Sequence, residues 1–94
     1  MKFNHDIKPA PSTVNEIELM KQLAVNLKWL RQSNRIPQRV LAEYLNIDRS
    51  TYCYYETEKS HPTIVTLKRI ADFYRLTVDN LLNKDLKKNY MLNT

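Results

Sequence analysis

The sequence predicts an all-α protein that folds as a single compact bundle of five helices. Three observations support this fold class. The 94-residue chain contains no glycine and only 4 prolines, so it lacks the residues on which tight β-turns depend. Its apolar residues recur at spacings of three and four, as they do along one face of a helix. Its length is sufficient for one domain with a modest core.

The first helix is expected over residues 16–33. Asn15 can cap its start, and Glu18 follows at the spacing of a capping box, in which two side chains satisfy amides of the first turn. The apolar stripe of this helix consists of Ile17, Met20, Leu23, Ala24, Leu27 and Leu30. This repeat makes the first helix a clearly predicted element.

The second helix is expected over residues 37–45, with Pro37 in the first turn, where its missing amide donor costs nothing. Its inward-facing residues are expected to be Val40, Leu41, Tyr44 and Leu45. A tight turn follows at residues 46–48. Such a turn usually needs one residue with a positive φ, and asparagine tolerates that conformation best after glycine. Asn46 therefore indicates the turn.

The third helix, expected over residues 48–57, has two distinct sides. Asp48 is suited to cap it, because a carboxylate can accept hydrogen bonds from the first-turn amides. Tyr52 and Tyr55 are three residues apart and share one side, which we expect to be buried. The other side carries Arg49, Ser50, Cys53 and Tyr54. This polar outer side is the main candidate for a functional surface.

The fourth helix is expected over residues 64–74, and the fifth over residues 78–83. Thr63 and Thr77 are suited to cap them. The inner face of the fourth helix is expected to contain Ile64, Leu67, Ile70, Ala71 and Tyr74. Arg75 stands where a helix often ends in glycine, which implies a small local strain.

The two ends of the chain lie outside the predicted domain, residues 16–83. Residues 1–15 are expected to form a flexible arm, because Pro9 and Pro11 disfavour both helix and central strand. The tail, residues 84–94, has two alternatives: a frayed end, or an extension of the last helix with an apolar stripe that forms a dimer contact. That stripe consists of Leu82, Leu86, Tyr90, Met91 and Leu92.

The composition limits the compartment and the partners. Lys and Arg outnumber Asp and Glu by 15 to 10, a formal charge of +5, which favours a polyanionic partner. One cysteine, Cys53, excludes an internal disulfide and is expected to be a bystander rather than a redox switch. No apolar run suggests a signal peptide or a bilayer span. We therefore expect a soluble cytoplasmic protein without membrane attachment.

Residues 26–82 resemble the phage-repressor-like helix-turn-helix family, also called the Cro/Xre type. The matching residues are Gln38-x-x-Leu41-Ala42-Glu43-x-Leu45-Asn46-Ile47-Asp48-Arg49-Ser50-Thr51-Tyr52, Tyr55-Glu56, Lys59, Pro62-Thr63, Thr66-Leu67, Ile70-Ala71 and Thr77-x-Asp79-x-Leu81-Leu82. The chain departs from the family pattern at Pro37, Asn46, Tyr52, Tyr55 and Arg75. The resemblance implies a lambda-repressor-like five-helix bundle whose second and third helices form the DNA-reading unit.

The resemblance also implies a function: sequence-specific binding of double-stranded DNA by a transcriptional regulator, most simply a repressor. The helix over residues 48–57 would enter the major groove. The implied base-reading residues are Asp48, Arg49, Ser50 and Tyr54. Arg49 is the strongest of them, because guanidinium can donate two hydrogen bonds to guanine. The alternatives are that Arg49 pairs with Asp48 or solvent, and that Tyr54 is a partly covered surface ring.

Other residues are implied to hold the DNA backbone or the fold. The candidate phosphate contacts are Gln38, Arg39, Lys59, Ser60 and Thr63, and each alone is as readily explained as solvated surface. Arg31 and Glu56 occupy positions that in the family often form an internal ion pair. Lys2 and Lys8 in the arm are weaker candidates for a DNA contact.

Several alternatives remain open on the sequence. The protein could be an antitoxin that binds a toxin or another protein through its C-terminal region and regulates itself by binding DNA. RNA binding is less supported, because the aromatic residues of the third helix mostly point inward. Catalysis, a cofactor and a metal site are not expected, because His5 and His61 lie in separate proline-flanked loops. A homodimer is expected, since one such domain reads few base pairs. Control is expected to come from concentration, a partner or competition for the operator.

Overall fold

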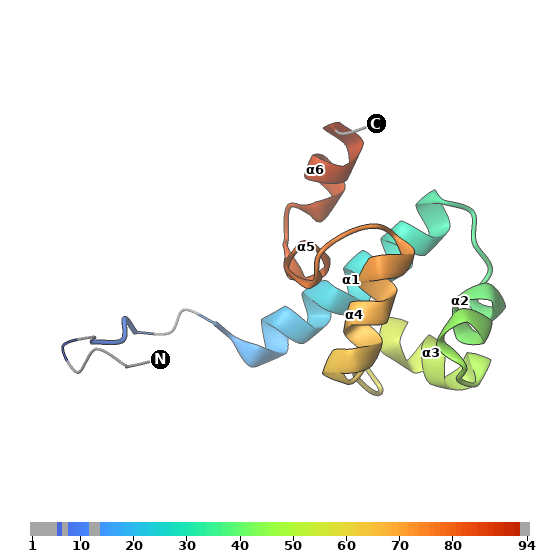
Figure 1. The fold of residues 1–94 in the computed structure, drawn as a ribbon, viewed down its shortest axis with the longest axis horizontal. Helices are drawn as coiled ribbons and strands as arrows, with labels where there is room; N and C mark the ends of the chain where they lie inside the picture. Colours follow the sequence, from blue (N-terminus) through green and yellow to red (C-terminus); the bar gives the residue numbers. More distant parts are fainter. Residues whose placement is uncertain (1–5, 7, 12–13, 93–94) are drawn as a thin grey trace.

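The computed structural model describes residues 6, 8–11 and 14–92, with side chains through Tyr90. These residues form helices and loops and no β-strand, which confirms the all-α fold class. The described residues form six helices rather than the five expected, because the tail forms one of its own (Figure 1). Their bounds are α1 Glu16–Ser33, α2 Gln38–Leu45, α3 Arg49–Glu56, α4 Ile64–Phe73, α5 Val78–Leu82 and α6 Leu86–Leu92. No helix in this described part combines the length and apolarity that crossing a bilayer requires.

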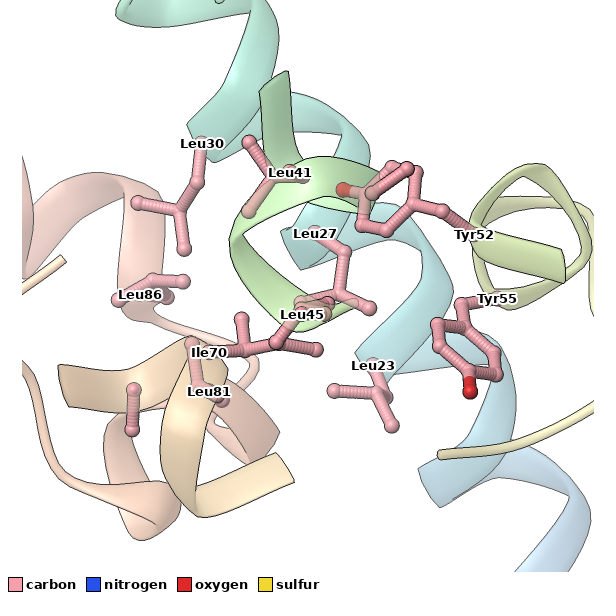
Figure 2. Close-up of a cluster of buried hydrophobic side chains, with 12 residues drawn as sticks. Leu23, Leu27, Leu30, Leu41, Leu45, Tyr52, Tyr55, Ile70, Leu81 and Leu86 are labelled. Atoms are coloured by element: carbon pink, nitrogen blue, oxygen red, sulfur yellow. The ribbon is translucent and has the colours of Figure 1, made fainter. Parts of the chain in front are cut away.

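The core lies where all six helices converge (Figure 2). Its most deeply buried large side chains are Leu27, Leu30, Leu41, Tyr52, Ile70 and Leu81. They come from α1 to α5, and Leu86 adds a buried contact from α6. Burying side chains of this size contributes about 1.5–3 kcal/mol each. The core therefore holds together elements that are far apart in the chain.

Three residues that were expected to face inward are exposed. Ile17 and Ile64 are 66% and 85% exposed, although both were expected to face inward. Each lies in the first turn of its helix, and the neighbouring elements do not cover either turn. Tyr44 is also more exposed than expected, at 42%. Its ring packs against the edge of the Phe73 ring instead, at a centroid distance of 4.9 Å.

The tail does not extend α5. Asn83 has an extended backbone, with ψ of 129°, and α6 begins three residues later. Leu86 is buried, and the Tyr90 ring contacts the edge of Trp29 on α1 at a centroid distance of 5.5 Å. The Tyr90 hydroxyl donates to Oδ1 of Asn34 at 3.3 Å. The stripe expected to meet a partner is thus used within the chain as far as Tyr90, while the side chains of Met91 and Leu92 lie outside the described residues.

A buried asparagine joins α1 to α5, a contact that the sequence analysis missed. Asn26 is 4% exposed, and its Nδ2 donates to the carbonyl oxygens of Leu81 and Asn83 at 2.8 and 2.9 Å. Nε2 of Gln22 donates to Oδ1 of Asn26 at 2.9 Å. The available signal was a polar residue within the apolar stripe of α1, because such a position requires internal hydrogen bonds.

Four helices end on a residue with positive φ, and none of these residues is glycine. They are Arg35, Asn46, Glu58 and Arg75, with φ between 56° and 66°. In each case the next residue donates its amide to a carbonyl five positions earlier, as Leu76 does to Ala71 at 2.8 Å. This is the Schellman closure, which satisfies carbonyls at a helix end. A left-handed conformation costs a residue with a Cβ about 1–2 kcal/mol.

We expect Arg75→Gly to raise the free energy of unfolding by about 1 kcal/mol, because glycine adopts this conformation without the steric penalty. Urea denaturation measures the change. Arg75→Ala is the matched control, since it removes the same exposed side chain but keeps the Cβ. Equal stabilities of the two variants would contradict the assignment of strain to the backbone.

Candidate nucleic-acid interface

The turn between α2 and α3 is closed by backbone hydrogen bonds around Asn46. Asn46 has φ 56° and ψ 47°, and its amide donates to the carbonyl of Glu43 at 3.1 Å. The Ile47 amide donates to the carbonyl of Ala42 at 3.0 Å. These bonds reverse the chain within three residues, so α3 starts beside the end of α2 (Figure 1). The expectation that Asn46 makes this turn is confirmed.

Asp48 stands at the start of α3 but does not cap it as expected. Its backbone is extended, with ψ of 148°, and its side chain accepts no hydrogen bond from the first-turn amides. The carboxylate is exposed instead. A helix start without a side-chain cap leaves amide donors directed to solvent. Asp48 therefore occupies the N-cap position of α3, but its side chain lies on the outer surface and makes no capping hydrogen bond.

The two sides of α3 differ as its sequence pattern predicts. Tyr52 is 0% exposed and Tyr55 is 8% exposed, and their rings meet edge to face at 6.1 Å. On the other side, Arg49, Ser50 and Tyr54 are exposed. Burial of the two tyrosine rings locks the rotation of the helix about its axis. The orientation of the three exposed side chains is consequently set by the core.

An ion pair beneath α3 joins it to α1. The Arg31 guanidinium donates to Glu56 through two nitrogens: Nε to Oε2 at 2.7 Å, and Nη2 to Oε1 at 2.9 Å. Its third nitrogen, Nη1, donates to the Ile36 carbonyl at 3.0 Å. The Glu56 side chain is 1% exposed and that of Arg31 13%. A two-pronged pair of this kind restricts both position and direction.

The environment of Glu56 keeps its carboxylate charged. Burial alone would raise the pKa, but the hydrogen bonds from Arg31 and Gln38, together with the nearby Tyr52 hydroxyl, outweigh burial and lower the pKa below its usual 4.5. The Tyr52 hydroxyl is near the carboxylate without a hydrogen bond of standard geometry, and burial raises its own pKa. The Glu56 hydrogen bond raises the pKa of Arg31. Both partners of the ion pair are therefore ionised at neutral pH.

The candidate phosphate contacts fall into two groups, at the start of α2 and in the loop after α3. In the first group, Gln38 is half-buried and its Nε2 donates to Oε1 of Glu56 at 3.2 Å. One amide hydrogen thereby remains for another acceptor. Arg39 is exposed, and its guanidinium is 3.8 Å from Glu43. Gln38 therefore links the ion pair to the surface.

The second group includes Lys59, Ser60 and Thr63. Lys59 is exposed, with its ammonium 5.5 Å from the centre of the Tyr54 ring. Ser60 is half-buried, and its amide donates to the Tyr54 carbonyl at 3.4 Å. Thr63 caps α4 by accepting from the Thr66 amide at 3.2 Å, as expected. The Thr63 hydroxyl thus already has a structural role.

The charge around α3 is nearly balanced. Residues 38–63 contain three basic side chains, Arg39, Arg49 and Lys59. They also contain four acidic side chains, Glu43, Asp48, Glu56 and Glu58. Glu56 is neutralised by Arg31 from outside this range. This stretch of sequence therefore carries no excess of positive charge, and what distinguishes it is its exposed, oriented polar side chains.

The described part of the chain contains hollows but no metal-ligand cluster. No three His, Cys, Asp or Glu side chains there gather as a metal site requires. One hollow of about 280 Å³ lies between the start of α1 and the end of α5, and another of about 300 Å³ lies beside α6. Neither is lined by α3 residues. Lys2 and His5, which the sequence analysis considered, lie outside the described residues.

Comparison with known proteins decides the family. A family model described as "Helix-turn-helix" matches residues 27–81, more than half of the chain. The chain belongs to the helix-turn-helix family. The resemblance expected from the sequence is confirmed, and the matched residues include both α2 and α3. In this chain the helix-turn-helix unit is thus the pair of helices joined at Asn46.

Relatives of this helix-turn-helix chain include two regulators. It is 35% identical over 57 residues to the HTH-type transcriptional activator BcrR of Enterococcus faecalis, covering 61% of the chain and 28% of that protein. It is 36% identical over 69 residues to the HTH-type transcriptional regulator ImmR of Bacillus subtilis, covering 71% of the chain and 54% of that protein. The chain therefore spans about half or less of the length of these relatives.

A solved structure has a similar fold. It is the crystal structure of a transcriptional regulator from Listeria innocua, with a TM-score of 0.62 and 29% identity. The match covers 76% of this chain and 73% of the other. The shared fold therefore extends beyond the helix-turn-helix unit alone.

We expect Glu56→Gln to lower the free energy of unfolding by about 3 kcal/mol, because Arg31 would be left partly buried without a charged partner. Urea unfolding at pH 7 measures the loss. Glu43→Gln is the matched control, since the Glu43 side chain is 73% exposed and such surface pairs contribute at most about 1 kcal/mol. Losses of equal size in both variants would refute the role given to the buried pair.

The pH dependence of this prediction has a definite sign. Folding lowers the pKa of Glu56 below 4.5, so its contribution is complete above about pH 4.5 and is lost as the pH falls through the folded pKa. The stability of the unmodified protein should therefore fall more steeply in acid than that of Glu56→Gln. Parallel stability curves below pH 4.5 would contradict this.

Proposed function

We propose that this protein is a sequence-specific regulator of transcription that places α3 in the major groove of double-stranded DNA. The observation that carries the proposal is the outer side of α3, where Arg49, Ser50 and Tyr54 are exposed while Tyr52 and Tyr55 are buried. A recognition helix requires this combination of a locked inner side and exposed hydrogen-bonding groups. The names of the relatives, both of them transcriptional regulators, support the same function.

The proposed contacts separate into base reading and backbone binding. Asp48, Arg49, Ser50 and Tyr54 would meet base edges, with Arg49 donating two hydrogen bonds to a guanine. Gln38, Arg39, Lys59, Ser60 and Thr63 would hold phosphates on either side. The second amide hydrogen of Gln38 suits it to this role, because the first is occupied by Glu56. Phosphate contacts set the register of α3, and base contacts supply the specificity.

The mode of regulation is a further part of the proposal. A helix-turn-helix domain that is bound over a promoter excludes RNA polymerase from it. We therefore propose that the protein represses transcription, and that it does so in the cytoplasm. Binding to a toxin through the tail is not part of the proposal. Leu86 and Tyr90, two of the four residues on which that alternative depended, already contact the chain's own core and α1. The side chains of the other two, Met91 and Leu92, lie outside the described residues. A transcription assay with the selected operator placed across or upstream of a promoter distinguishes repression from activation.

Arg49→Ala should relax the base preference at one operator position and lower specific affinity by about 1–3 kcal/mol, because it removes the paired hydrogen bonds to guanine. Selection from randomised duplexes followed by binding titrations measures both effects. Arg39→Ala is the matched control, since a lost phosphate contact should weaken all duplexes alike. Base preferences that are unchanged in Arg49→Ala would refute the assignment of Arg49.

We propose that two copies bind together, because one domain of this size reads few base pairs. Two copies should bind a duplex whose half-sites are separated by about 34–36 Å, one helical turn. Sedimentation of the complex with the selected duplex measures its stoichiometry. A duplex carrying the same half-sites displaced by half a turn is the control and should bind less tightly. Tight binding of one copy per duplex would contradict the proposal.

A further inference from the structure

The end of α3 brings two candidate DNA contacts together. Glu58 has φ of 66°, and this left-handed residue turns the chain back over the helix. The amide of Lys59 then donates to the Tyr54 carbonyl at 3.1 Å, and that of Ser60 to the same carbonyl at 3.4 Å. In a Schellman closure the residue after the left-handed one lies beside the residue five positions earlier. The backbone thus places Lys59 next to Tyr54.

The side chains of these two residues are also in contact. The Lys59 ammonium lies 5.5 Å from the centre of the Tyr54 ring, within the range of a cation–π interaction. At this position of the motif the contact is usually apolar. Among the described residues, the ion pairs do not include Lys59, although Glu58 is its neighbour in the chain. The Tyr54 ring is therefore what holds the ammonium.

We propose that Tyr54 is a positioning residue for Lys59, and that its ring holds the ammonium where a phosphate lies beside the major groove. This inference rests on the proposed function, since it assigns Tyr54 a role in DNA binding. Lysine has a flexible side chain, so a free Lys59 would lose much conformational freedom on contacting a phosphate. A ring that holds it beforehand reduces that loss. The base-facing side of α3 and its backbone contact are thereby coupled.

The coupling is specific to the aromatic ring rather than to the hydroxyl. Tyr54 is 42% exposed, so replacing it should not disturb the core. Tyr54→Phe keeps the ring and its attraction for the ammonium, whereas Tyr54→Leu removes that attraction while keeping an apolar side chain. The pair of variants therefore separates positioning from a direct hydrogen bond to DNA by the Tyr54 hydroxyl.

The test is the salt dependence of DNA binding by the full chain, measured on the selected duplex and on an unrelated duplex. One phosphate contact contributes about 0.9 to the slope of log K against log salt concentration. Lys59→Met should lower the slope by about this amount. We expect Tyr54→Leu to lower it towards the Lys59→Met value and Tyr54→Phe to keep the original slope. Adding Tyr54→Leu to the Lys59→Met variant should not change the slope further.

Three results would overturn the positioning role. They are an unchanged slope in Tyr54→Leu, an equal fall in Tyr54→Phe, and additive falls in the double variant. The proposed function fails separately, if the unmodified protein prefers no duplex sequence. In that case the slope on the unrelated duplex still decides whether Tyr54 acts through Lys59. If the protein binds no DNA at all, both proposals fail.

Discussion

The buried ion pair between Arg31 and Glu56 is the constraint on which the proposed DNA surface depends. It fastens the end of α3 to α1 by two hydrogen bonds, and Gln38 extends it to the start of α2. A buried pair is weak evidence for stability, because removing charges from water costs about as much as their attraction returns. Its main effect here is on the orientation of α3. Guanidinium and carboxylate fit in one geometry, so the pair sets the angle of α3 that its apolar contacts alone would leave less defined.

The absence of glycine gives this bundle an unusual set of helix ends. Each Schellman closure is made by a residue with a Cβ, which costs free energy that glycine would not. The left-handed positions instead carry polar or charged side chains: Arg35, Asn46, Glu58 and Arg75. At the end of α3, Glu58 takes this conformation next to Lys59, so a turn required by the fold also adjusts the charge of the candidate DNA surface. Local strain and the distribution of charge are thus connected at one residue.

Most of the fold could be predicted from the sequence, because helical spacing and capping residues are local signals. The start and end of α1 and the turn at Asn46 are examples. Local signals do not show which helical turns are covered by other parts of the chain. For this reason Ile64 was expected to be buried, although it lies at the surface. They also do not tell whether Asp48 uses its side chain as a cap. The contacts of Asn26 and of Tyr90 join residues more than fifty positions apart, which local patterns do not encode.

In the candidate site, too, some features could be predicted from local sequence patterns and others could not. The exposure of Arg49 follows from helix periodicity, whereas the contact between Tyr54 and Lys59 depends on a reversal at Glu58 that its residue type does not favour. The near balance of charge around α3 gives this contact additional weight. A strongly basic surface would hold DNA whatever the position of one lysine. Residues 38–63 carry three cations against three exposed acids, so the proposed contact of Lys59 with a phosphate would depend on where its ammonium is held. The Tyr54 ring would set that position.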